Sequence, residues 1–257
     1  MSARIPLSCF LITFNEGDRL DRTLAAVADW VDEIVVVDSG STDQTLAVAE
    51  AHGARVFQRE WPGYGPQKRF AEDQCRHDWV LNLDADEEVT PALAAEIQAL
   101  FSGNGPPLDY YRFRVTTVYP GFDKPRWLAE TYNIVRLYKR SVGRYSDSPY
   151  WDRVDISGGQ GGQLSAIVHH HSVRSLSHKI DKLNRYTDLQ VEKGMDKPLP
   201  LLVLRFFTEL PVAFIRYYVF RRHFTGGLYG IATASVSAFF RWMRIAKILE
   251  RRRSEKR

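Results

Sequence analysis

Two carboxylates one residue apart, Asp84 and Asp86, directly follow the apolar run 80–83. A buried parallel strand presents its last residues at the carboxyl edge of its sheet, where open α/β folds bind ligands. Two carboxylates there repel each other unless a cation lies between them, and a hard divalent ion takes oxygen ligands and can also hold a phosphate. The pattern therefore predicts a metal-phosphate site. The alternative is a solvated acidic loop that caps the next helix.

Two earlier loops also follow apolar runs of strand length. They are 13–17 and 38–43, and both are rich in small polar residues. In a doubly wound sheet these loops lie on the same edge as Asp84, and the acid Asp38 is well placed to accept hydrogen bonds from a ribose or a base. A turn that ends in a helix N-cap is the alternative for 38–43.

Strand and helix patterns alternate through the first hundred residues, which predicts an α/β fold built on a parallel sheet with right-handed crossovers. The expected strands are 6–14, 33–38, 55–58 and 80–83; the expected helices are 20–31, 42–52, 67–76 and a segment capped by Thr90 and begun by Pro91.

After Phe101 the pattern changes. Alternation at 110–119 and 133–140 predicts strands that extend the sheet in antiparallel fashion. Residues 141–163 are rich in Gly, Ser and Asp and are expected to form a long active-site loop. A helix is expected over 177–193.

Residues 198–240 combine many apolar side chains with arginines, and no stretch reaches the ~18–20 uncharged residues of a spanning helix. This composition favours helices that lie in a membrane interface. A helical subdomain packed on the core is the alternative, and a nucleic-acid surface is disfavoured because the basic residues alternate with apolar ones. We expect two parts, 1–175 and 176–257.

Bulk properties are those of a globular protein of 257 residues, with 44% hydrophobic and 26% charged residues. The net charge of +4 divides into −5 for residues 1–215 and +9 for 216–257. Two cysteines imply no disulfide framework, and the chain enters a strand without signal-peptide features, so the cytoplasm is the expected compartment.

Taken together in order, three segments resemble the family 2 glycosyltransferases of the GT-A fold: Ile12–Glu16, Ile34–Asp43 and Leu81–Glu87. Further segments resemble the branch that adds glucose to the inner core of bacterial lipopolysaccharide: Gly63–Ala71, His170–Ser172, Lys182–Tyr186 and the tail around Gly227–Gly230.

The resemblance implies a UDP-sugar donor, inversion at the anomeric carbon, and a Mg2+ or Mn2+ ion bridging the diphosphate. It assigns donor-binding roles to Thr13, Asn15 and Glu16 around the nucleotide, Asp38 at uridine, Lys68 near the diphosphate, and Asp84 with Ala85 beside it. Asp84 and Asp86 would hold the metal, which neutralises the leaving nucleoside diphosphate.

An inverting displacement needs a base for the acceptor hydroxyl. The resembling branch commonly has an acid in a Val-His-Glu setting, whereas this chain has Val154-Asp155-Ile156. Asp155 is therefore the first candidate and Asp152 the second. A further departure is Thr225-Gly226-Gly227, where an acidic residue before glycine is more usual.

Three consecutive histidines occupy 169–171. Consecutive strand residues point to opposite faces, so the three cannot all bind one metal within a strand. We expect His170 to face the site and contact metal or phosphate.

These features predict a metal-dependent, inverting glycosyltransferase, peripheral on the cytoplasmic face of the inner membrane. It would move a hexose, with glucose as the first expectation, from UDP to a lipid-linked saccharide such as lipopolysaccharide core. The alternative is a nucleotide-sugar or lipid-binding scaffold that has lost its base. A nucleotidyltransferase is disfavoured because no Gly-rich phosphate loop follows the first strand.

Overall fold

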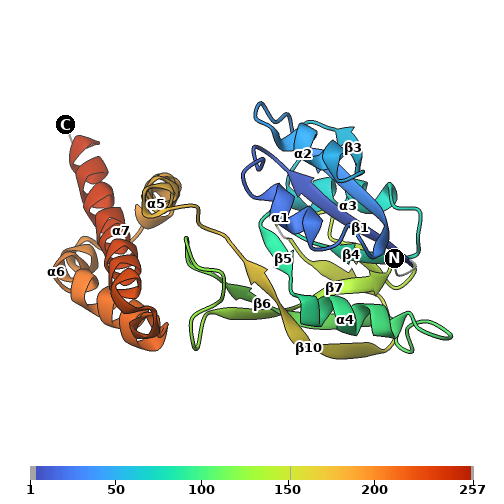
Figure 1. Cartoon of the computed structure of the whole chain (residues 1–257). Coiled ribbons are helices and arrows are strands. Elements are labelled where there is room, and N and C mark those ends of the chain that lie inside the picture. Colours follow the sequence, from blue (N-terminus) through green and yellow to red (C-terminus); the bar gives the residue numbers. More distant parts are fainter. Residues whose placement is uncertain (1–3, 151, 256–257) are drawn as a thin grey trace. The chain divides into compact units, whose positions relative to one another are not determined.

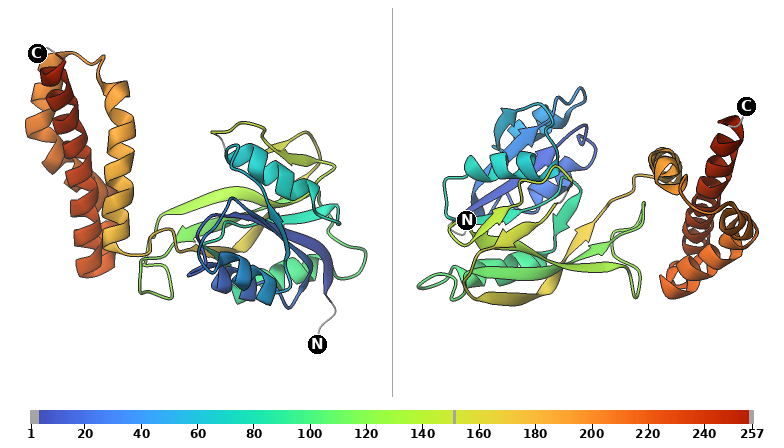
Figure 2. Two further views of the ribbon diagram at one scale, coloured as in Figure 1. Left: turned by 90° about the horizontal axis from the view of Figure 1, so that it is seen from above. Right: turned by 180° about the vertical axis from the view of Figure 1, so that it is seen from behind.

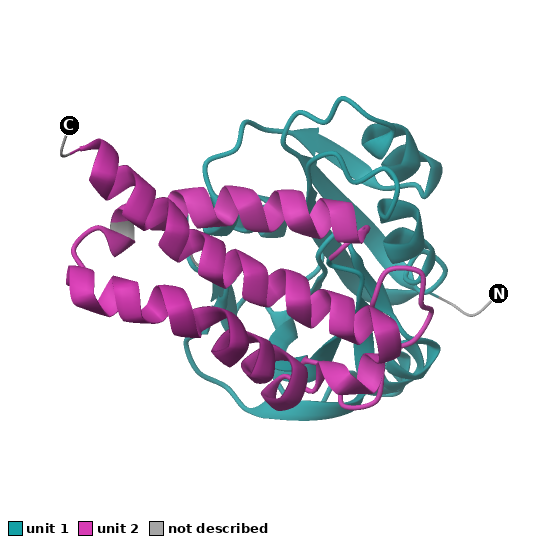
Figure 3. Ribbon diagram, turned by 90° about the vertical axis from the view of Figure 1, so that its left-hand side faces the viewer, with its two compact units in different colours: residues 1–117, 131–172 teal, residues 118–130, 173–257 magenta. Residues whose placement is uncertain are grey.

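The structure is a computed structural model that describes residues 4–150 and 152–255. The chain forms two compact units, shown in Figure 3, and each is described by itself. Unit 1 comprises 1–117 and 131–172, and unit 2 comprises 118–130 and 173–257. The sequence indicated a division at 175 and gave no sign that 118–130 belongs with the C-terminal segment.

Unit 1 contains all ten strands of the described residues and four helices (Figure 1). The strands are β1 (Ile5–Thr13), β2 (Val31–Asp38), β3 (Arg55–Gln58), β4 (Trp79–Asn82), β5 (Glu87–Val89), β6 (Tyr110–Thr117), β7 (Thr131–Lys139), β8 (Gly143–Tyr145), β9 (Val154–Ile156) and β10 (Gly161–His170). The helices are α1 (Leu20–Ala25), α2 (Thr45–Ala51), α3 (Tyr64–Asp73) and α4 (Pro91–Leu100).

Eight strands form one mixed sheet in the order β3-β2-β1-β4-β7-β6-β10-β5. β1 pairs in parallel with β2 and β4, and β2 pairs in parallel with β3. β7 is antiparallel to both β4 and β6, so the predicted antiparallel extension is confirmed. Figure 2 shows the same elements from above and from behind. The order places the carboxyl ends of β2, β1 and β4 side by side.

Side chains alternate along each strand, so neighbouring residues of β1 enter two different apolar cores, one on each face of the sheet. From β1, Leu7, Cys9 and Leu11 enter a core that includes residues of α1, α2 and α4. Phe10 enters a second core with Ala71 of α3. This burial explains why β1 and β2 read as nearly continuous apolar runs in the sequence.

The prediction of a long loop over 141–163 is wrong, because the segment contains β8, β9 and the start of β10. β8 and β9 pair as a two-stranded sheet, with Gly143 opposite Ile156. A Cβ at Gly143 would lie 2.9 Å from Ile156 Cδ1, so glycine permits this close pairing. Strands of three residues are too short for a period of two to be read from the sequence.

Unit 2 is helical apart from the connection 118–130. It contains α5 (Leu176–Val191), the 3-10 turn η1 (Glu192–Gly194), α6 (Leu199–Ile215), the π-helical turn η2 (Arg216–Phe220), the 3-10 turn η3 (His223–Gly226) and α7 (Gly227–Ser254). The predicted α/β class with a mixed sheet and a helical C-terminal region is confirmed.

A small apolar core joins α6 and α7 in unit 2, built on Leu202, Ile245 and Ile248. Buried Glu209 of α6 is held by Arg205 at 2.6 Å and Arg241 at 2.7 Å. Within the described part of the chain, no helix has the length and apolar character needed to cross a bilayer.

Candidate functional site

Two strand ends meet at Thr13 and Asp38, which are register partners in β1 and β2. Thr13 Oγ1 donates to Asp38 Oδ1 at 3.0 Å, and the backbone N–H groups of Gly40 and Ser41 donate to Oδ2 at 2.9 and 2.8 Å. Ser41 Oγ also donates to Oδ1. A carboxylate has about four acceptor positions, so buried Asp38 here shapes the loop that follows it.

Asn15 and Glu16 connect this loop to the end of β1. The backbone N–H of Asn15 donates to Ser41 Oγ at 2.8 Å, and Asn15 Oδ1 accepts from the Thr42 N–H at 2.9 Å. The N–H of Glu16 donates to Thr45 Oγ1 at 2.8 Å. Asn15 has a φ of 54°, a left-handed conformation that asparagine tolerates better than most residues. The predicted nucleotide-lining residues thus belong to one hydrogen-bonded edge.

Asp84 follows β4 and lies between two buried cations. Lys68 Nζ of α3 is 2.6 Å from Oδ1, and Arg136 of β7 is 2.8 Å from Oδ2. Burial alone would raise the pKa of Asp84, but the charges of Arg136 and Lys68 hold it well below its usual range. Asp84 is therefore ionised and has protein cations on both oxygens.

Arg136 is a central residue of the site that sequence reasoning missed. Its guanidinium also contacts Glu87 at 3.0 Å and Tyr145 Oη at 3.2 Å, and it donates to Asn82 Oδ1. Burial, together with the charge of Asp84, raises the pKa of Glu87 to about 7 despite the contact with Arg136. The available sequence signal was an arginine inside the apolar stretch of a strand, where a lone buried charge is costly.

Lys68 joins the strand-end acid to the segment that precedes β9. Its side chain is 1% exposed, and Nζ lies 2.8 Å from Asp152 as well as 2.6 Å from Asp84. Burial would lower the pKa of Lys68, but the charges of Asp84, Tyr145 and Asp152 together offset this and raise it. Asp152 is thus brought to the site. Asp155 is exposed on β9 and pairs with Arg153 at 3.0 Å, away from the Lys68 cluster.

Asp86 and His170 meet on the same side of the sheet. His170 Nε2 lies 3.4 Å from Asp86 Oδ1, and Arg19 lies 3.0 Å from Oδ2. Burial would lower the pKa of His170, but its hydrogen bond to Asp86 raises it. Burial would raise the pKa of Asp86, but the bond from His170 and the charge of Arg19 lower it. Ala85 is buried between the acids, and its carbonyl accepts from Thr23 Oγ1 at 2.9 Å.

The donor set fits a hard divalent ion. Asp86 Oδ1 and His170 Nε2 are separated by 3.4 Å, near the ~3 Å between adjacent ligands of a six-coordinate ion with bonds of roughly 2.1 Å. A nitrogen and a carboxylate oxygen suit Mn2+, and carboxylates suit Mg2+. Asp84 already has a protein cation on each carboxylate oxygen, so a metal ion there would compete with Lys68 and Arg136 for its charge.

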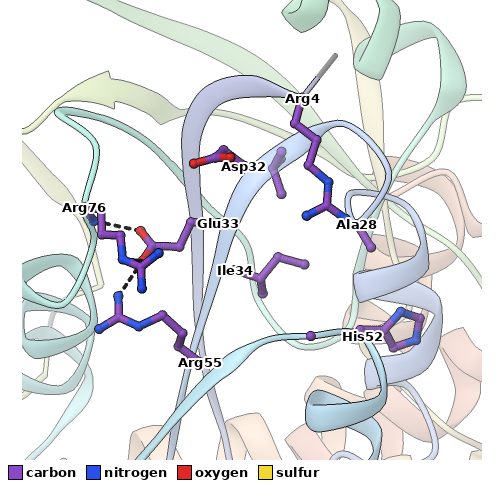
Figure 4. Close-up of a pocket in the computed structure, with 10 residues that line it drawn as sticks. Arg4, Ala28, Asp32, Glu33, Ile34, His52, Arg55 and Arg76 are labelled. Atoms are coloured by element: carbon purple, nitrogen blue, oxygen red, sulfur yellow. Dashed lines mark hydrogen bonds and ion pairs between the residues drawn. The ribbon is translucent and has the colours of Figure 1, made fainter. Parts of the chain in front are cut away.

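A separate pocket lies at the opposite, amino-terminal end of β2 (Figure 4). Arg55 and Arg76 both turn toward buried Glu33, which also accepts from Ser8 Oγ. Burial would raise the pKa of Glu33, but the hydrogen bonds from Arg76 and Ser8 lower it. These contacts satisfy the carboxylate and anchor β2, and the pocket lies away from the strand ends that carry Asp38 and Asp84.

The chain resembles known proteins along most of its length. The model of the family described as glycosyl transferase family 2 matches residues 8–163. An uncharacterised glycosyltransferase of Rickettsia prowazekii is 34% identical, over 94% of this chain and 86% of the relative. The lipopolysaccharide core biosynthesis glycosyltransferase LpsC of Rhizobium meliloti is 29% identical, over 98% of this chain and 94% of the relative.

Among solved structures, that of S. aureus TarS 1–349 in complex with UDP-GlcNAc matches with a TM-score of 0.39 and 25% identity. The match covers 47% of this chain and 37% of the TarS chain. An overlap of this size supports no inference about the site.

Proposed function

Because the chain belongs to glycosyltransferase family 2 and has the GT-A fold, we propose that it transfers a hexose, glucose in the first instance, from a UDP-sugar to a lipid-linked saccharide with inversion. The observation that carries this proposal is the convergence of Thr13, Asp38 and Asp84 at three neighbouring strand ends, with buried Lys68 beside them. The relationship to LpsC supports lipopolysaccharide core as the acceptor class.

The donor lies along this edge in the proposal. The nucleotide end is formed by Thr13, Asn15, Glu16 and Asp38. Asp38 orders the loop that follows it, and one of its oxygens accepts a hydrogen bond from uridine in place of one of its present bonds within the protein. Asp86 and His170 would hold a Mg2+ or Mn2+ ion, which would supply positive charge where the diphosphate departs. Lys68 provides a second positive charge near that end of the site.

Asp152 is the proposed base. The acceptor oxygen forms a bond to the anomeric carbon as the bond to the diphosphate breaks, and the hydroxyl proton passes to a carboxylate oxygen of Asp152. Its ion pair with Lys68, which also binds Asp84, supports this assignment over Asp155, which pairs with Arg153 instead.

Unit 2 is proposed to bind the cytoplasmic face of the inner membrane, where a lipid-linked acceptor is held. Large apolar side chains are exposed on α6 and η2, among them Phe207 and Phe220, and Arg216 and Arg221 are exposed on the same segment. Exposed aromatic and basic residues together suit an anionic interface.

The donor site is tested by isothermal titration of UDP with and without Mn2+. We expect binding that requires the metal and that Asp86→Ala abolishes. Wild-type binding of UDP that is indifferent to Mn2+, or no binding at all, would refute the proposed donor site.

The base is tested with matched variants of the two acids. Asp152→Asn is expected to reduce transfer by at least the roughly 100-fold that general-base catalysis contributes, while leaving UDP binding within a few fold. Asp155→Asn should retain near wild-type turnover. The reverse pattern would assign the base to Asp155, and a wild-type chain that binds UDP-sugar but turns over no acceptor would favour the scaffold.

A further inference from the structure

The three consecutive histidines fall on two faces of the sheet. β10 is antiparallel to β5, with His170 opposite Glu87 and His169 opposite Glu88. Because side chains alternate along paired strands, His170 and Glu87 share the face that holds Arg136, and His169 and Glu88 share the other face. His171, two residues beyond His169, returns to the face of His169.

The second face brings three ligand-type side chains together. One ring nitrogen of His169, one of His171 and a carboxylate oxygen of Glu88 all lie within 4.8 Å of one another. His171 Nε2 and Glu88 Oε2 are 3.1 Å apart, and the rings of His169 and His171 are 6.4 Å apart between centroids. All three residues are partly buried.

This set matches the ligands of a borderline transition metal. Ligands of a tetrahedral zinc ion lie about 3.3–3.5 Å apart at ordinary bond lengths. The Glu88–His171 pair, at 3.1 Å, is close to that spacing. A ring nitrogen of His169 lies within 4.8 Å of both partners, and a side-chain adjustment can bring it closer. Two imidazoles and one carboxylate are soft enough for Zn2+ and too few in oxygens for Ca2+.

We propose that Glu88, His169 and His171 form a Zn2+ site, with water as the fourth ligand, on the face of β5 and β10 opposite the Asp86–His170 pair. The ion would fix the end of β10 to β5, because two ligands come from the end of one strand and one from the other. This proposal does not depend on the glycosyl-transfer reaction.

Arg22 of α1 is the neighbour that competes with the ion. Its Nη1 lies 3.1 Å from His171 Nε2, and its Nε lies 4.0 Å from Glu88. The Arg22 side chain is half exposed, so it can turn into solvent when a metal binds. The alternative is that the three side chains only bind Arg22. In that case, replacing Arg22 would not increase the affinity for Zn2+.

The test is titration of Zn2+ into the full chain carrying Asp86→Asn, which weakens the opposite face as a competing zinc site. We expect one equivalent to bind. Adding His169→Ala or His171→Ala should weaken binding by more than the ~100-fold that loss of an outer-shell partner costs. His77→Ala, a matched change at a histidine paired with Asp32, should leave binding unchanged.

A second variant guards against misfolding. Arg22→Gln should tighten Zn2+ binding and increase the zinc-dependent rise in melting temperature, a gain that a damaged fold cannot produce. Absence of zinc binding in the Asp86→Asn chain, binding that survives His169→Ala and His171→Ala, or weaker binding after Arg22→Gln would each overturn the proposal.

Discussion

At the scale of single residues, the candidate site depends on buried cations that hold its acids in place. Lys68 and Arg136 both contact Asp84, and Arg136 alone reaches Glu87. Removing one partner of a buried ion pair leaves a charge without compensation, which costs more than the pair contributes. The site is therefore sensitive to residues that need not touch the substrate.

Arg136→Met is expected to destabilise the fold by about 3–5 kcal/mol, because Asp84 and Glu87 lose the guanidinium while remaining buried. Equilibrium denaturation in urea measures this free energy of unfolding. Arg153→Met removes an exposed pair with Asp155 and should change it by less than about 0.5 kcal/mol. Equal effects of the two substitutions would contradict the role given to Arg136.

At the scale of elements, α3 approaches the backbone before β9 closely enough to exclude a side chain. A Cβ at Gly65 would lie 2.1 Å from the carbonyl oxygen of Ser146 and 2.5 Å from that of Ser148. This contact lies near the start of the helix that carries Lys68, and the backbone it touches leads to Asp152. Glycine thus allows the helix and the strand segment to bring these charges together.

Gly65→Ala should destabilise the protein by about 1–3 kcal/mol, as overpacking against backbone does, and should lower glycosyl transfer by displacing Lys68 from Asp152. Thermal unfolding and a transfer assay on the same preparation check both effects. Gly158→Ala is the control, since nothing lies within 4 Å of its added Cβ. A Gly65→Ala protein as stable and active as the control would show that the contact has no such role.

In unit 2, η3 carries His223, whose imidazole is neutral at pH 7 in the folded protein. Burial and the nearby charges of Arg126 and Lys179 lower the pKa of His223 to about 4. Between that value and the ordinary ~6.5, the unfolded chain binds a proton that the folded one does not, so stability falls as pH decreases.

Denaturation profiles at pH 7 and pH 4.5 should therefore differ more in the wild type than in His223→Gln, which cannot titrate. The expected difference is about 1–2 kcal/mol, the linkage value reduced because solvent still reaches the ring. Identical pH dependence in the two proteins would show that His223 titrates alike in the folded and unfolded chain.

The sequence predicted elements best where apolar patterns were long. β3 and the Thr90 cap appear as expected, and β1, β2 and β4 differ by a few residues at their ends. β5, β8 and β9 were missed because three residues carry no readable period, and the ten-residue β10 was missed as well. The cluster around Arg136 of β7 was missed for another reason: its partners come from β4, the residues after β4, β5 and β8, and only the folded sheet brings those segments together.

At the scale of the whole molecule, charge and exposed apolar surface are distributed unevenly along the chain. Residues 1–215 carry −5 and residues 216–257 carry +9. The largest exposed apolar side chains of α6 and η2, Phe207 and Phe220, are each 75% exposed. Such a distribution favours attachment to an anionic surface through unit 2 and works against it through the mildly acidic N-terminal part.

The full chain should therefore sediment with vesicles that contain phosphatidylglycerol, and less with neutral vesicles or at higher salt. Phe207→Glu with Phe220→Glu should reduce the bound fraction several fold. A control chain with glutamate at two exposed unit 1 positions, Ser102→Glu and Thr42→Glu, keeps the same net charge and should bind as the wild type. Equal losses in both chains would mean that net charge alone governs attachment.

The alternation of side chains along β10 limits how this segment can change in length. Inserting or deleting one residue before His169 would turn the Asp86-facing imidazole to the other side of the sheet and bring its neighbours to the donor edge. One insertion or deletion would break both the Asp86–His170 pair and the Glu88–His169–His171 group. A substitution at His169 or His170 affects only one of the two. Length variation among descendants of this chain should therefore collect at the Gly158–Gly159 turn and spare the strand that follows.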